Sequence, residues 1–220
     1  SPWPEIRKKR INDLLPKAMK AANVDCWLLT ARENNNDPLA DHVGAENAGG
    51  TAVFMFYLND EGFTSKVFSP EGEATALADL KIHDEVVRVK RGTSAIDQAA
   101  EFIKSQSFNT IAVNYSESNN VADGLSYTQY KFLETALGEE ESKLVSSTEL
   151  VYEWLSIKLP EEVDIMRKAA QLTSDWQYEV YEKIIPGKTT DADVAKMLKA
   201  KMKEFGVKDG WSPAQNPNVN

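Results

Sequence analysis

Apolar residues follow two alternating patterns along the first two thirds of the chain, short runs of strand length and longer stretches at helical spacing. The clearest strand, at residues 51–58, is β-branched and aromatic and runs into the turn sequence at residues 59–62. Strands are predicted at residues 26–30, 51–58, 63–69, 85–89, 110–113 and 144–145, and helices at residues 71–80, 94–105, 126–137 and 147–155. Strands that alternate with helices indicate an α/β fold, with a mixed or parallel sheet covered by helices on its faces.

A helix that precedes the first strand is predicted to be interrupted. Its apolar side comprises Ile11, Leu14, Leu15, Ala18, Met19 and Ala22. Pro16 lies inside this pattern, and a proline ring clashes with the preceding turn of a helix and removes one hydrogen bond. We therefore expect a kink, or the start of a second short helix, at this point.

A second region begins near Pro160. A proline suits the first turn of a helix, and Glu161 and Glu162 place negative charge at the positive end of the helix dipole. The apolar stripe of this long helix is Met166, Ala169, Thr173, Trp176, Val180 and Ile184, and that of the next helix is Val194, Leu198, Met202 and Phe205. Two helices leave apolar faces with little to cover them. We predict a first domain at residues 1–152 and an incomplete second domain at residues 153–220.

Charge and composition narrow the classes of function. The 220-residue chain has a net charge of −9, which argues against a general affinity for nucleic acid or anionic membranes. Residues 1–152 hold 23 acidic and 15 basic side chains. This excess leaves open that the region binds a basic partner, although a solvated acidic surface is the favoured interpretation. No run approaches the roughly 18 apolar residues of a membrane span. No leader sequence is visible, and a cytoplasmic location is expected unless a leader was removed ahead of Ser1.

The residues that most often carry chemistry favour structural interpretations here. Cys26 lies in an apolar run and is predicted to be a buried core residue. His42 is close to Asp37, Asp41 and Glu46, but this spacing matches no standard metal site, so a polar surface loop is favoured. The second histidine, at position 83, is predicted to lie in a solvated connection between a helix and a strand. The glycine-rich residues 47–51 lack the pattern of a phosphate loop and are predicted to form a turn.

One polar loop stands out, at residues 32–37. It directly follows the first predicted strand and combines Arg32 with several hydrogen-bonding side chains, among them Asn34 and Asn35. Sheet proteins often place binding residues on such loops. The same residues are equally typical of a capped turn, so both interpretations stay open.

Three segments around the second region carry a resemblance to a known family. They are residues 149–162, which include Lys158-Leu159-Pro160-Glu161-Glu162, then residues 166–170 (Met-Arg-Lys-Ala-Ala) and residues 185–190 (Ile-Pro-Gly-Lys-Thr-Thr). This arrangement resembles the creatinase/aminopeptidase P/prolidase family, the pita-bread metallopeptidases, at the opening of their catalytic domain. Val163 stands where the family often has Ile. Residues 10–29 and the polar loop after them resemble the family's N-terminal domain.

The resemblance implies a fold and an activity. It implies a creatinase-type N-terminal domain, with a ribonuclease-H-like mixed sheet and helices, followed by a truncated α+β pita-bread domain that begins with two long helices. Family members hydrolyse peptide bonds next to proline, using two divalent metal ions (Mn, Co or Zn) held by two Asp, one His and two Glu. All five ligands follow the region that matches residues 216–220. We therefore expect no catalytic or metal-binding residue in this chain, and no activity from the chain alone.

The resemblance also implies partners. In several family members the N-terminal domain supports a homodimer and reaches into the partner's active site, so Arg32, Asn34 and Asn35 are expected contacts for a proline-containing peptide. Two alternatives within the same family stay open. One is a non-catalytic domain that binds proteins such as histones, and the other is a creatinase-like amidinohydrolase that needs no metal.

Overall fold

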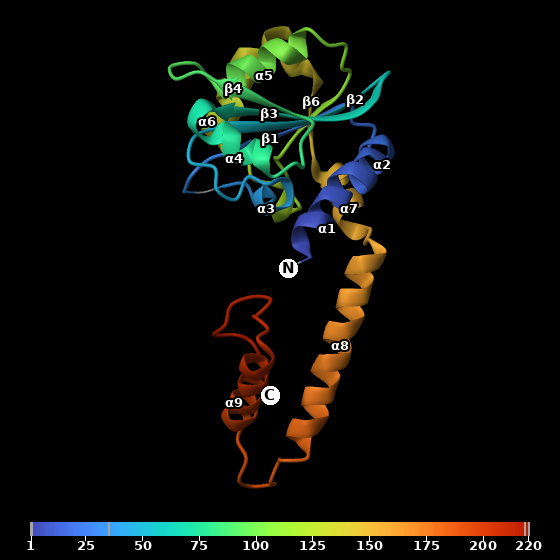
Figure 1. Ribbon diagram of the computed structural model, residues 1–220, viewed down its shortest axis with the longest axis vertical. Coiled ribbons are helices and arrows are strands. Elements are labelled where there is room, and N and C mark those ends of the chain that lie inside the picture. Colours follow the sequence, from blue (N-terminus) through green and yellow to red (C-terminus); the bar gives the residue numbers. More distant parts are fainter. Residues whose placement is uncertain (1, 35, 218, 220) are drawn as a thin grey trace. The chain divides into compact units, whose positions relative to one another are not determined.

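The computed structural model describes residues 2–34, 36–217 and 219, and the chain forms two units, Ser1–Leu159 and Pro160–Asn220 (Figure 1). The first unit holds a six-stranded sheet in the order β4-β3-β2-β1-β5-β6. Its strands are β1 (Cys26–Ala31), β2 (Ala52–Asn59), β3 (Gly62–Pro70), β4 (Glu85–Val89), β5 (Ile111–Val113) and β6 (Leu144–Ser146). The β1–β2 and β2–β3 pairs are antiparallel and the other three pairs are parallel, so the predicted mixed α/β sheet and the hairpin are confirmed.

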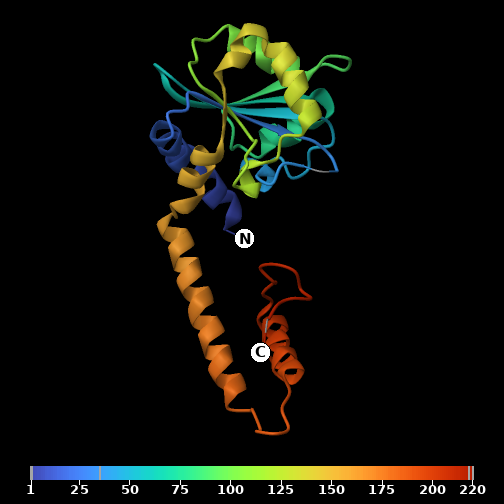
Figure 2. The same cartoon turned by 180° about the vertical axis from the view of Figure 1, so that it is seen from behind.

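Helices cover both faces of this sheet (Figure 1, Figure 2). Successive residues of a strand point to opposite faces: Trp27 and Leu29 pack into one core, with helices α1 (Trp3–Lys9), α2 (Leu15–Ala21) and α7 (Thr148–Ser156), whereas Leu28 packs into the other. The second core is closed by α5 (Ala95–Lys104) and α6 (Tyr127–Leu137). The other α-helices described in this unit are α4 (Glu71–Asp79), which was predicted, and the short α3 (Ala40–Val43), which was not. Cys26 is fully buried, as expected.

The predicted interruption of the first helix is confirmed. α1 ends at Lys9, the five residues Arg10–Leu14 form a π-helical turn, and α2 begins at Leu15 with Pro16 in its first turn. Proline has no backbone N–H to donate at this position. The backbone N–H of Leu15 instead reaches back to the carbonyl of Arg10, which widens the turn.

Helix α7 belongs to the first unit. Trp154 is fully buried, packs edge-on against Trp27 with ring centroids 5.5 Å apart, and donates its indole N–H to the Arg10 carbonyl at 2.9 Å. The guanidinium of Arg10 donates in return to the Trp154 carbonyl at 2.5 Å. The predicted boundary between residues 152 and 153 lies inside this helix, whereas contacts in the structure divide the chain between Leu159 and Pro160.

The second unit contains the two expected helices, α8 (Pro160–Tyr181) and α9 (Asp191–Phe205). Trp176 and Val180 of α8 are buried, and the Trp176 ring lies 5.2 Å from the ring of Phe205 in α9. Met166, which belongs to the same predicted stripe, is 55% exposed. α9 therefore covers only part of the stripe. Of the helices in the described residues, none has the length and apolar character that crossing a membrane requires.

The position of the boundary can be tested by truncation. We expect residues 1–159 to unfold cooperatively on their own, and residues 1–152 to be less stable by about 3–5 kcal/mol, because they lack a buried tryptophan of the first core. Urea unfolding followed by circular dichroism measures the difference. Tyr152→Ala, at a side chain that is 62% exposed, is the control and should change stability by less than about 0.5 kcal/mol. Equal stability of the two fragments would support the boundary between residues 152 and 153.

Candidate functional site

The parallel strands β1, β5 and β6 end at the same edge of the sheet, and polar side chains gather where they end. Ligands of α/β proteins commonly bind outside the carboxyl ends of parallel strands. The residue that follows β5 is Asn114, the one that follows β6 is Ser147, and β1 leads into residues 32–51, the β1–β2 connection. This edge of the sheet is therefore the candidate ligand-binding site.

A buried hydrogen-bond network joins these strand ends. The amide oxygen of Asn114 accepts from the indole N–H of Trp27 and from the hydroxyl of Ser147, each at 2.7 Å. Its amide nitrogen donates to Oδ2 of Asp37 at 2.8 Å. Asn114 and Ser147 are almost completely buried. Since buried polar groups are costly without partners, this network holds the start of the connection against β5.

Asp37 uses both of its carboxylate oxygens. While Oδ2 meets Asn114, Oδ1 accepts from the backbone N–H of Leu39 at 2.8 Å. Burial raises the pKa of the Asp37 carboxyl, and these two hydrogen bonds oppose the shift. A Cβ atom at Gly124 would lie 2.0 Å from Oδ2, so only glycine fits beside the carboxylate. The prediction that Asp37 lies in a polar surface loop is wrong, because its side chain is buried and bonded to Asn114.

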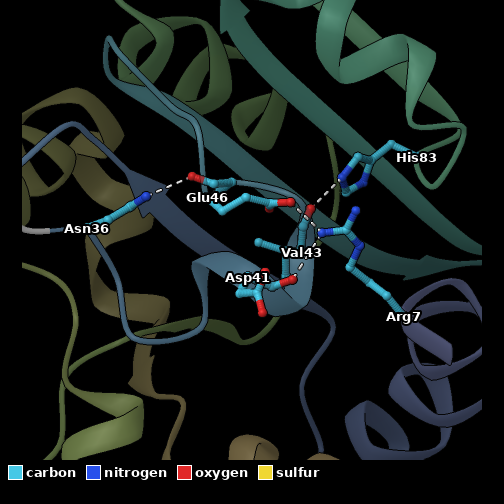
Figure 3. Close-up of polar contacts among 7 residues, drawn as sticks. Arg7, Asn36, Asp41, Val43, Glu46 and His83 are labelled. Atoms are coloured by element: carbon cyan, nitrogen blue, oxygen red, sulfur yellow. Dashed lines mark hydrogen bonds and ion pairs between the residues drawn. The ribbon is translucent and has the colours of Figure 1, made fainter. Parts of the chain in front are cut away.

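Arg7 of α1 binds the middle of the β1–β2 connection (Figure 3). Its Nη1 atom donates to the Asp41 carbonyl at 3.1 Å and to Oε1 of Glu46 at 2.9 Å, and the residue is only 5% exposed. Only the arginine of this ion pair is buried, since the Glu46 side chain is 33% exposed, and a buried charge that loses its partner is costly. The arginine thus attaches the connection to the first helix.

His83 binds the same segment from the connection between α4 and β4 (Figure 3). Its Nε2 atom lies 2.8 Å from the Val43 carbonyl, and its ring contacts Phe54 and Phe56. Burial, with a smaller contribution from the charge of Arg7, lowers the pKa of His83 to about 4. The neutral ring must therefore carry its proton on Nε2, because a carbonyl only accepts. The predicted solvated connection is wrong at this residue, since two aromatic side chains of β2 cover it.

The predicted binding residues lie at the start of the connection. The backbone N–H of Arg32 donates to Oδ1 of Asn36 at 3.2 Å, and Asn34 is exposed with a left-handed φ of 53°. Asn35 lies outside the described residues. The Asn36 side chain also accepts from the backbone N–H of Asp37, and contact of Arg32 and Asn34 with a ligand stays a proposal. Sequence reasoning missed Asn114, although its place directly after an apolar strand was a usable signal.

The described residues offer no metal centre. Within residues 2–34, 36–217 and 219, no group of three or more His, Cys, Asp or Glu side chains is placed to hold a metal ion. Glu46 pairs with Arg7, and the ring of His42 packs against Trp154 with centroids 5.8 Å apart. Burial also raises the pKa of the Cys26 thiol, which leaves it protonated and unreactive.

The chain has the fold of the creatinase/prolidase proteins. Three solved structures carry the comparison: an Xaa-Pro dipeptidase from Bacillus anthracis (18% identity, TM-score 0.54), an X-Pro aminopeptidase from Thermotoga maritima (17%, 0.53) and the dipeptidase PepE from Mycobacterium ulcerans (18%, 0.56). The matches cover 92%, 86% and 90% of this chain, and 49%, 49% and 50% of those chains. The chain therefore spans about half the length of the structures it matches. No family model and no curated protein matches the sequence.

The buried imidazole should make stability depend on pH. The pKa of His83 is lower in the folded state, about 4, than the ordinary value near 6.5, so its contribution is complete above pH 6.5 and is lost as the pH falls toward 4. We expect the stability difference between the wild type and His83→Gln to shrink by about 2 kcal/mol from pH 7 to pH 5. Urea unfolding at the two pH values measures it. A difference that does not change with pH would contradict the buried, neutral ring.

The Asp37 carboxylate can be tested with its neutral isostere. Both oxygens accept hydrogen bonds, so an amide at this position must face one N–H donor with its own NH₂ group. We expect Asp37→Asn to cost about 1–3 kcal/mol, and Asp41→Asn, at an exposed side chain, to cost less than about 0.5 kcal/mol. Thermal unfolding measures both variants. A more stable Asp37→Asn variant would mean that desolvation of the carboxylate outweighs the lost acceptor.

Proposed function

We propose that this chain is the amino-terminal part of a metal-dependent Xaa-Pro peptidase of the creatinase/aminopeptidase P/prolidase family, which hydrolyses peptide bonds next to proline. The observation that carries the proposal is a fold shared with three such peptidases over 86–92% of this chain but only about half of theirs. The motifs that carry the resemblance support it. Pro160 is the first residue of α8, and Pro186-Gly187 lies at the joint between α8 and α9.

In this proposal the two units have different roles. The first supplies the domain for homodimerisation and substrate access, and the second opens the pita-bread catalytic domain. The described residues do not fit a centre of two divalent metal ions. Because the family's ligands follow the region that matches residues 216–220, we assign the metal ligands, for Mn²⁺, Co²⁺ or Zn²⁺, to a later part of a longer protein, and expect the 220-residue chain alone to be inactive.

A second candidate function is a non-catalytic domain that binds a basic protein. One observation favours it, namely the excess of 23 acidic over 15 basic residues in positions 1–152. Charge complementarity of this kind promotes association with a basic surface. In that case the longer protein would lack the set of metal ligands.

A hydrolysis assay on the longer protein that contains this chain tests the proposal. With Mn²⁺ we expect cleavage of peptides that carry proline after the scissile bond, loss of activity with a chelator, and no cleavage when alanine replaces that proline. The 220-residue chain, assayed in parallel, should be inactive. A folded longer protein without any Xaa-Pro activity, or without the Asp, Asp, His, Glu, Glu set, would overturn the proposal and favour the binding domain.

The role of Arg32 as a substrate contact has its own test. In the longer protein, Arg32→Ala should raise the KM for a proline-containing peptide by about 10- to 100-fold, the effect of losing one charge-assisted hydrogen bond. The kcat should stay within about twofold, because the contact would be equally strong in the ground state and the transition state. Arg91→Ala, at an exposed arginine on a turn, is the matched control. An unchanged KM for Arg32→Ala would exclude this contact.

A further inference from the structure

Asn36 joins the predicted binding loop to the rest of the β1–β2 connection. Its Oδ1 atom accepts from the backbone N–H groups of Arg32 at 3.2 Å and of Asp37 at 2.9 Å, while its Nδ2 atom donates to the Ala45 carbonyl at 2.7 Å. One side chain thus closes the turn that carries Arg32 and attaches that turn to a segment nine residues further along the chain. A carboxylate at this position would supply the acceptor but not the donor.

The segment that Asn36 holds is itself fixed from the opposite side (Figure 3). Arg7 donates to the Asp41 carbonyl, and His83 lies within hydrogen-bond distance of the Val43 carbonyl. Asn36 donates to the Ala45 carbonyl, so every second carbonyl from residue 41 to residue 45 accepts a hydrogen bond from a side chain. The three donors come from three different parts of the chain. The backbone of residues 41–45 therefore connects Arg7 and His83 on one side with Asn36, and through Asn36 with the backbone of Arg32.

We propose that Asn36 is a positioning residue, which sets the place of Arg32 for substrate by tying its turn to the fixed segment at residues 41–46. The inference has two halves. The functional half, that Arg32 contacts substrate, rests on the proposed function, whereas the structural half, that Asn36 holds the turn of Arg32, concerns this chain alone. It also separates two roles of one side chain. Asn36→Asp keeps the acceptor that closes the turn and loses the donor to Ala45, whereas Asn36→Ala loses both.

The structural half can be measured on the 220-residue chain by ¹⁵N relaxation. We expect the order parameter of the Arg32 amide to fall from about 0.85 to below about 0.6 in Asn36→Asp. The control is Asn47→Asp, which adds the same charge at an exposed position of the same connection and should leave the Arg32 amide unchanged. An Arg32 amide that stays rigid in Asn36→Asp, or that loosens equally in the control, overturns the inference.

The functional half uses the longer peptidase. We expect Asn36→Asp to raise KM about three- to tenfold with kcat within about twofold, and the double variant with Arg32→Ala to be no worse than Arg32→Ala alone, because Asn36 acts through Arg32. Additive effects, or a loss in kcat only, overturn the inference even when the peptidase is confirmed. If the longer protein has no Xaa-Pro activity, the proposed function fails, and the relaxation measurement still decides whether Asn36 positions Arg32.

Discussion

Burial of the β1–β2 connection imposes the constraint on which the candidate site depends. Val43 and Ala45 are fully buried, so the backbone carbonyls around them have little access to water and need donors from the protein. Secondary structure supplies few of these donors, because α3 is only four residues long. Side chains supply them instead, and each one fixes the connection at another point. The conformation of the β1–β2 connection is thus a consequence of supplying hydrogen-bond donors to its buried carbonyls.

The alternation of short apolar runs and helical stripes was enough to predict the sheet, its hairpin and the helices around it. Periodicity works well here because β1 lies between two cores and every one of its residues is buried. The sequence did not predict α3, since four residues carry no periodic signal and the following Gly44 is typical of a turn. The kink at Pro16 was predictable because its cause is local.

The sequence predicted only those features of the site that depend on residues close together in the chain. The asparagine-rich sequence after β1 indicated side-chain hydrogen bonds to nearby backbone, and Asn36 accepts two of them. The partners of His83 and Asn114 lie far away in the sequence, 40 residues for Val43 and 77 for Asp37. Nothing near position 83 indicates that phenylalanines from another strand will cover the ring, so a polar neighbourhood was mistaken for an exposed one. Burial of a polar side chain is a property of the tertiary fold.

Charge explains how Arg7 and His83 can lie close together and both donate to residues 41–43. A guanidinium beside an imidazole disfavours a second positive charge, and the charge of Arg7 contributes to the low pKa of His83. Glu46 lies 2.9 Å from the same guanidinium and compensates its charge directly. A neutral ring with its proton on Nε2 suits a carbonyl acceptor, so the arrangement persists at every pH well above 4. A metal-bound water in a peptidase acts near neutral pH. The hydrogen bond that His83 donates to the Val43 carbonyl would therefore be kept in the pH range in which the proposed chemistry can run.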